Sequence, residues 1–311
     1  YSGLLVTETM YTLFMLGAFV AAFRMTDKIG VGTGILLGVA SALAALTRAV
    51  FLGFFPVLVF IIWWMRRQQG RKGVKHLAVA VVAWALVLLP WTLRNYAVHG
   101  SFVPVSTGGG KVLLTGNNPF APRTWHAKGF EEWVKEKAVE RGIKDLSALP
   151  ETQLHSLYKG IALNFITSHP FDAMRLALQK AHIFWVYPVA HSDSAIGEQA
   201  LVTVADVVLY IGAAIGLVAC WEYRRRMLPI GLAVAFFFLT AVMFHAEARF
   251  RLPIMPFICI LFGYAATVVF DKARRIEFVK HRQKQIAAGL AIAGILCVYA
   301  YTGMLFLTGK V

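Results

Sequence analysis

The chain has 311 residues and is strongly apolar: 58% of them are hydrophobic, 15% are charged, and the mean hydropathy is +0.64. A water-soluble fold of this size is normally less apolar, so the composition excludes an ordinary soluble globular domain and indicates a membrane protein. The net charge of +15 would suggest a nucleic-acid partner in a soluble protein. Beside long apolar runs it instead indicates basic loops at a membrane surface, and we expect no nucleic-acid partner.

Eight apolar segments are long enough to cross a bilayer, which takes about 20 mostly apolar residues, with a range of about 17 to 25. They predict an all-α polytopic membrane protein with about eight transmembrane helices and a mainly helical loop domain outside the cytosol. The second and third spans form a tight hairpin around Thr47 and Arg48. The predicted spans are residues 4–23, 31–47, 49–65, 77–93, 201–221, 228–244, 252–270 and 286–307.

The connections between these spans alternate in charge. The basic connections are residues 24–30, 66–76, 222–227 and 271–285, with 2, 5, 3 and 6 Lys or Arg. Short cytosolic loops hold the excess of Lys and Arg in membrane proteins, so these four are predicted to be cytosolic. The opposite side then holds Tyr1, Arg48, the loop 94–200, the turn 245–251 and the C-terminus. This gives three parts: transmembrane helices 1 to 4 in residues 1–93, the loop domain in 94–200, and helices 5 to 8 in 201–311.

Small residues within the spans predict packing rather than chemistry. Gly30, Gly34 and Gly38 recur every four residues in the second span, a spacing that lets another helix approach closely. Cys220, Cys259 and Cys297 lie in or at the end of apolar segments without CxxC spacing. We interpret these cysteines as inert packing residues.

The loop 94–200 is too long for a simple connection, and we expect a small folded unit there. Its opening, Ser101 to Pro119, is rich in Gly, Asn and Pro, which favours irregular backbone over helix. Two later segments, Leu154 to Ile166 and Phe171 to Tyr187, carry apolar residues at the spacing of one helix face. Such helices either lie along a membrane interface or cover the core of the loop itself, and the sequence leaves both interpretations open.

Two patterns give only weak indications of a ligand. Gly108 to Gly110 lacks the GxxxxGK[ST] pattern and the preceding strand of a phosphate-binding loop, so it does not predict nucleotide binding. His245 and Glu247 are two residues apart, which is a weak indication of a metal site. We therefore predict no resident metal.

A stronger indication comes from ionisable residues at span ends on the predicted non-cytosolic side. They are Glu8, Arg48, Arg94, Glu247, Arg249 and Arg251. Ionisable groups at membrane depth are costly and tend to face a protein interior or a water-filled cavity. Guanidinium groups that converge there would suit a phosphate, which they bind in a bidentate manner. The alternative is that the arginines extend to lipid headgroups.

Several segments resemble membrane glycosyltransferases of the GT-C superfamily, in particular the protein O-mannosyltransferase and aminoarabinose-transferase type of family 39. These motifs are spread over most of the chain, in the family's order. They are Leu5 to Tyr11 (LVTETMY), Gly38 to Arg48 (GVASALAALTR), Pro90 to Tyr96 (PWTLRNY), Phe102 to Pro119 (FVPVSTGGGKVLLTGNNP) and His245 to Pro256 (HAEARFRLPIMP).

The resemblance implies a transferase that takes a sugar from a polyprenyl-phosphate-linked donor on the non-cytosolic face of the membrane. The acceptor would be a protein or glycolipid, and the location a bacterial inner membrane with the large loop in the periplasm. In that family the general base is an acidic residue in the first external loop, which has no counterpart here. The chain resembles the later part of a family member, so we name no catalytic residue and expect no activity from this chain alone.

By position in these motifs, the resemblance makes Arg48, Arg94, Arg249 and Arg251 candidates to bind the donor phosphate and stabilise its charge as it leaves. The residues expected to line the cavity are Glu8, Glu247, His245, Asn117 and Asn118. The resemblance does not decide whether the reaction needs a divalent cation. A lipid or solute transporter or flippase is the main alternative function, although no internal repeat is visible in the sequence. A scaffold whose loop binds a partner is the third.

Overall fold

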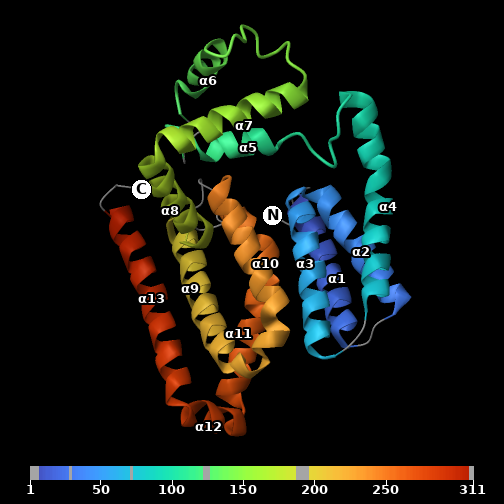
Figure 1. Ribbon diagram of the computed structural model, residues 1–311. Helices are drawn as coiled ribbons and strands as arrows, with labels where there is room; N and C mark the ends of the chain where they lie inside the picture. The colour runs from blue at the N-terminus through green and yellow to red at the C-terminus, as the bar shows by residue number, and fades with distance from the viewer. Residues whose placement is uncertain (1–6, 28–29, 71–72, 122–126, 187–195, 308–311) are drawn as a thin grey trace. The chain divides into compact units, whose positions relative to one another are not determined.

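The computed structural model describes residues 7–27, 30–70, 73–121, 127–186 and 196–307, and this part of the chain is helical without a β-strand (Figure 1). Seven helices have the length and hydropathy to cross a membrane, and α2, with 17 residues, is a shorter apolar helix. The prediction of an all-α polytopic membrane protein is confirmed. The helices at the predicted spans are α1 (Thr7–Asp27), α2 (Val31–Thr47), α3 (Val50–Gln68), α4 (Val74–His99), α9 (Ile196–Ala219), α10 (Arg224–Met243), α11 (Met255–Phe270) and α13 (Arg282–Leu307).

The chain forms two compact units. Unit 1 comprises residues 1–181 and 235–247, and unit 2 comprises residues 182–234 and 248–311. This division by contacts differs from the predicted division at residues 93 and 200, which follows membrane topology. The reason is that the loop makes contacts with the end of α10, as described below. The topological division stays a prediction.

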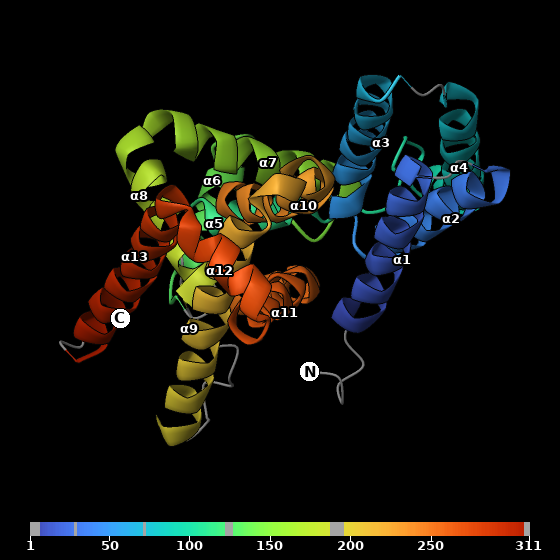
Figure 2. The ribbon, with the colours of Figure 1, turned by 90° about the horizontal axis from the view of Figure 1, so that it is seen from below.

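In unit 1, α2 packs between α1 and α4 (Figure 2). The contact with α4 depends on two glycines of the predicted small-residue stripe. A Cβ atom on Gly34 would lie 2.7 Å from the carbonyl oxygen of His76, and one on Gly38 would lie 2.3 Å from that of Ala80. Any side chain would therefore force the two helices apart. The predicted close helix approach is confirmed.

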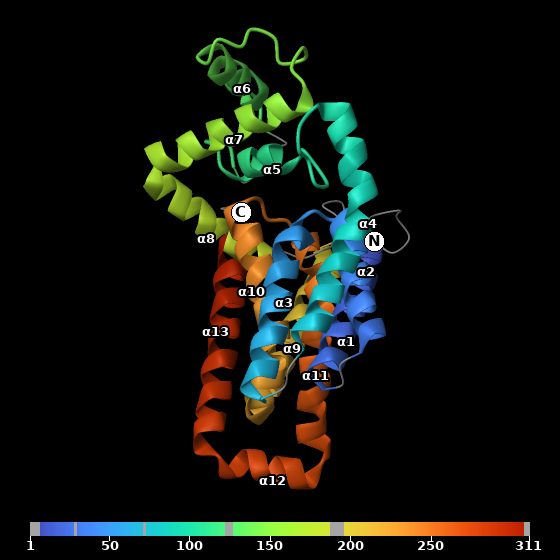
Figure 3. The ribbon, with the colours of Figure 1, turned by 45° about the vertical axis from the view of Figure 1, so that its right-hand side comes forward.

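The loop is a small folded unit, as predicted. Its helices are α5 (Gly109–Gly116), α6 (Phe130–Val139), α7 (Glu151–Ser168) and α8 (Pro170–Val186). Leu114, Val134, Ala138, Leu157, Ile161 and Ala162 form a shared buried core. Figure 3 shows α7 lying along α5.

The expectation of irregular backbone from Ser101 to Pro119 is wrong for its second half, which contains α5. The glycines there serve close packing as well as turns. A Cβ atom on Gly110 would lie 2.1 Å from the carbonyl oxygen of His155 in α7. A glycine run at a helix contact therefore looks the same in sequence as one in a loop.

The two amphipathic helices of the loop differ in what covers them. On α7, the apolar residues Leu157, Ile161 and Phe165 are buried. On α8, Phe171 is 81% exposed and Leu178 is 69% exposed. We infer that α7 covers the core of the loop and that the apolar face of α8 is available to lipid, as expected of a helix in a membrane interface.

Unit 2 contains α9, α11 and α13 packed side by side, and α12 (Lys272–Lys280) joins the ends of α11 and α13 (Figure 3). Gly216 of α9 lies so close to Leu261 of α11 that a Cβ atom would be 1.9 Å from its carbonyl oxygen. The three cysteines are free, and only Cys220 is buried. Cys259 and Cys297 are exposed, so the prediction of packing residues is wrong for these two.

Candidate functional site

An ion pair joins the first two motifs in unit 1. Arg48, at the junction of α2 and α3, binds the carboxylate of Glu8 in the first turn of α1. The Glu8 side chain is 5% exposed and that of Arg48 is 22% exposed. The two residues were predicted to share one membrane face, and the antiparallel packing of α1 on α2 brings them into contact. The guanidinium compensates a carboxylate that would be costly to bury alone.

Arg94 lies at the same end of unit 1 as this pair. Gly34 packs against His76, and Gly38, one turn later, packs against Ala80, so α2 and α4 run parallel. The same offset brings Arg48, at the end of α2, level with the turn of α4 that leads to Arg94. The Arg94 guanidinium lies 5.3 Å from the centre of the Trp91 ring and donates a hydrogen bond to Asn95 Oδ1 at 3.2 Å.

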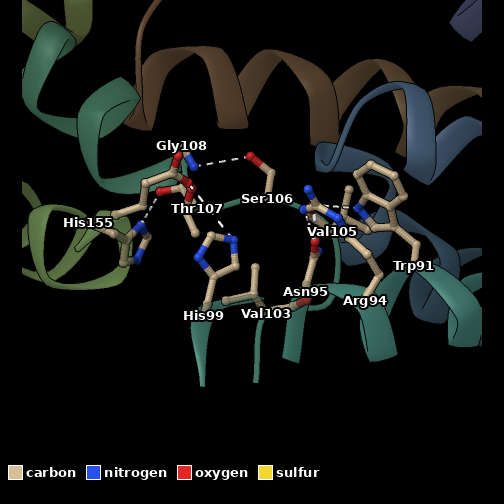
Figure 4. A network of polar contacts seen from close by, with 11 residues as sticks. Trp91, Arg94, Asn95, His99, Val103, Val105, Ser106, Thr107, Gly108 and His155 are labelled. Carbon is tan, nitrogen blue, oxygen red and sulfur yellow. Dashed lines mark hydrogen bonds and ion pairs between the residues drawn. The ribbon is translucent and has the colours of Figure 1, made fainter. Parts of the chain in front are cut away.

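The motif around Arg94 binds the segment that follows it (Figure 4). The amide of Asn95, which is buried, donates to the carbonyl oxygens of Val103 at 3.1 Å and Val105 at 3.2 Å. Trp91 Nε1 also donates to Val105, at 3.0 Å. The chain therefore turns back onto the last turns of α4. Four hydrogen bonds hold this turn, counting that of the Thr92 hydroxyl to Pro104 at 3.0 Å.

The start of α5 is fixed by His155 of α7, which Figure 4 places beside Thr107 and Gly108. His155 Nδ1 lies 2.8 Å from the carbonyl oxygen of Thr107 and 3.0 Å from the backbone nitrogen of Gly110. The backbone N–H of Gly110, in the first turn of α5, thus has a protein partner.

The segment Gly116 to Pro119 contacts the end of α10. The Asn117 amide donates to the carbonyl oxygens of Met243 at 2.9 Å and Phe244 at 3.2 Å. Gly116 lies so close that a Cβ atom would be 1.7 Å from the Phe244 carbonyl oxygen. Two motifs more than a hundred residues apart in the chain are thereby joined just before His245.

Lys180 of α8 completes this contact. Its ammonium group donates to Asn117 Oδ1 at 2.9 Å, and the residue is 2% exposed. Burial lowers the pKa of Lys180 to about 8, because the charged form loses water and no acidic side chain is in contact with it in the described part of the chain.

The remaining predicted cavity residues of unit 1 lie near this contact. Asn118 is fully buried and donates to the carbonyl oxygens of Leu114 and Thr115, so it shapes the end of α5. His245 Nε2 lies 3.2 Å from Glu247 Oε1. Among the described residues no third His, Cys, Asp or Glu joins them in a group that could hold a metal.

Arg249 and Arg251 belong to unit 2, so the structure describes them apart from Arg48 and Arg94. Arg251 is 1% exposed and pairs with Asp206 of α9, with an N–O distance of 2.5 Å. It also donates to the carbonyl oxygens of Phe184 at 3.3 Å and Trp185 at 2.9 Å. Its contacts therefore tie α8 and α9 together. The guanidinium of Arg249 lies 5.7 Å from the centre of the Phe250 ring.

Lys180 and Asp206 were missed by the sequence analysis. Both had a signal. Asp206 is an acidic residue inside an apolar span, where ionisable groups are rare. Lys180 lies opposite the exposed apolar face of α8, a place where a lysine would be expected in solvent. Only the structure shows that it is buried and bonded to Asn117, the residue that follows α5.

No family model, curated protein or solved structure matched this chain. What the fold defines is the class: an integral membrane protein of all-α polytopic architecture, in which the described helices carry one folded loop domain.

Proposed function

We propose that the chain belongs to a transferase that moves a sugar from a polyprenyl-phosphate-linked donor to a protein or glycolipid acceptor on the non-cytosolic face of the membrane. The proposal starts from the resemblance of five motifs to GT-C glycosyltransferases. The observation that carries it is that neighbouring pairs of these motifs are in contact within unit 1, up to the start of the fifth motif, whose residues from Ala248 on belong to unit 2. Glu8 pairs with Arg48, Asn95 binds Val103, and Asn117 binds Met243 and Phe244, next to His245.

Within this proposal, Arg48 and Arg94 bind the donor phosphate. Glu8 holds the Arg48 guanidinium in one orientation, and Trp91 does the same for Arg94 by a cation–π contact. Arginines held in this way lose less side-chain entropy when they bind a phosphate oxygen. Arg249 remains a further candidate. Arg251 acts in a positioning role, because its side chain, paired with Asp206 in unit 2, is only 1% exposed, whereas that of Arg48 is 22% exposed.

The test is binding of polyprenyl phosphate, compared with the phosphate-free polyprenol, to the purified protein in detergent. Arg48→Lys keeps the charge opposite Glu8 but loses the bidentate geometry, so it separates phosphate binding from folding. Arg94→Gln removes the second guanidinium. Each is expected to cost about 1.5 to 3 kcal/mol, the range for a hydrogen bond to a charged group, which is roughly ten- to a hundredfold in the dissociation constant.

The matched control is Arg24→Gln, which removes an exposed arginine in the last turn of α1, at the other end of the helix from Glu8. It is expected to bind like the parent. If the phosphate makes no difference, or if Arg48→Lys and Arg94→Gln both bind like the parent, the donor-site proposal fails. Uptake of polyprenyl phosphate across vesicles without sugar transfer would instead favour the transporter.

A further inference from the structure

A cavity of about 580 Å³ lies in unit 1 between the end of α3 and the beginning of α4. This volume is within the range of about 300 to 1,000 Å³ that small-molecule sites occupy. The 19 residues of α3 span about 28 Å, so this cavity and the Glu8–Arg48 pair lie at opposite ends of a membrane-length helix. The function proposed above makes no use of it.

The polar lining of this cavity is basic. Arg66, Arg67, Lys75 and His76 line it, and none of its described lining residues is acidic. Arg66 is buried and donates to the carbonyl oxygen of Met25 at 2.6 Å, so it anchors the wall to α1. Arg67 and Lys75 are exposed, and Arg67 lies 5.4 Å from the centre of the Trp63 ring. A site with this lining favours an anion.

The cavity also includes the first turn of α4, and the protein supplies that turn with no negative charge. Its N-cap, Gly73, makes no side-chain capping hydrogen bond, and the first turn contains no Asp or Glu. Helix N-termini bind phosphate groups because their free N–H donors and the helix dipole favour negative charge. His76, in the same turn, lines the cavity and is partly exposed. The helix dipole at this N-terminus therefore adds to the positive charge of the basic side chains that line the cavity.

The rest of the lining is apolar and continues into the membrane-spanning helices, with Trp63, Val74 and Leu77. A ligand that fits both the basic and the apolar lining of the cavity carries a phosphate group next to a hydrocarbon chain. We propose that this cavity binds the phosphate headgroup of an anionic phospholipid at the N-terminus of α4. Basic pockets between transmembrane helices commonly bind such headgroups.

The experiment is a lipid titration of the delipidated full chain, read by native mass spectrometry, with phosphatidylglycerol and with phosphatidylcholine of the same acyl chains. One tightly retained phosphatidylglycerol and no retained phosphatidylcholine are expected. Arg67→Gln with Lys75→Gln is expected to raise the dissociation constant about thirtyfold, or about fivefold for each charge at the membrane surface. Arg275→Gln with Lys280→Gln removes two exposed charges from another basic connection and should leave binding unchanged.

The variant Val74→Glu separates a loss of lipid binding from a folding defect. A glutamate in the first turn favours the helix dipole, so the apparent unfolding temperature should hold or rise while phosphatidylglycerol binding is lost. Equal losses in the two double glutamine variants would mean general surface attraction and overturn the proposal. Equal competition by glycerol 3-phosphate would show that the site takes a soluble phosphate instead, and would also overturn it. Polyprenyl-phosphate binding should be the same in Arg67→Gln with Lys75→Gln as in the parent, which keeps this test independent of the proposed function.

Discussion

The buried ammonium group of Lys180 donates a hydrogen bond to Asn117 Oδ1 at 2.9 Å, while the amide of Asn117 donates to the backbone at the end of α10. Asn117 thus uses both ends of its side chain to join the loop domain to a transmembrane helix. A neutral amide replaces a counter-ion here. The arrangement makes the contact sensitive to pH.

The first prediction concerns this pH dependence. Burial lowers the pKa of Lys180 to about 8, so the folded protein binds the proton less tightly than the unfolded chain, whose lysine pKa is about 10.4. Between these values the unfolded state binds more protons, and stability contributed by Lys180 rises with pH. The penalty for burying the charge is full below about pH 8.

Lys180→Met removes the titrating group while keeping a long apolar side chain. Its apparent unfolding temperature should be higher than that of the parent at pH 7. The difference between the two unfolding temperatures should be smaller at pH 9.5. Thermal scans of both proteins in the same detergent at the two pH values measure this. A difference that does not change with pH would mean that Lys180 does not titrate in this range.

The second prediction concerns the contact between Gly116 and Phe244. Gly116→Ala places a methyl group where the structure leaves 1.7 Å, so the loop must move away from the end of α10. Hydrogen exchange is expected to increase in residues 112–120 and 240–247 together. Gly160→Ala is the control, because a Cβ atom there meets nothing within 4 Å. Faster exchange in only one of the two segments would contradict the contact.

The third prediction concerns α2 and α4. Gly38→Ala should lower the free energy of unfolding by about 1 to 3 kcal/mol, the usual cost of overpacking a tight contact. Gly32→Ala, on the same helix but with open space around it, should be neutral or stabilising by about 0.5 to 1 kcal/mol. Chemical denaturation in mixed micelles compares the two. Similar effects at both positions would argue against the close packing.

The fourth prediction separates a structural Arg251 from one that binds ligand. Arg251→Met leaves Asp206 buried without its cation, which typically costs about 3 to 5 kcal/mol. Adding Asp206→Leu should recover much of that loss. A double-mutant cycle on unfolding measures the coupling. Additive effects would show that the two residues do not act as a pair.

The spans were predictable because lipid imposes one requirement, about 20 apolar residues in a helix that satisfies its own backbone hydrogen bonds. The contacts between the motifs could not be predicted from the sequence. Whether Arg251 faces a ligand or Asp206 depends on how the helix is rotated about its axis. The sequence is compatible with either orientation. The burial of Lys180 depends in turn on where Asn117, which follows α5, lies relative to α8. Periodicity on α8 gave the exposed apolar face but could not reveal that the opposite face is covered.

The most direct test of the donor site is to map where the lipid binds. A polyprenyl phosphate with a photoreactive group next to the phosphate should cross-link to peptides containing Arg48 and Arg94, and excess unlabelled polyprenyl phosphate should abolish the labelling. Polyprenol should not compete. If labelling is confined to peptides around Trp63 and His76, or is the same with both competitors, the arginines of unit 1 do not form a donor-phosphate site.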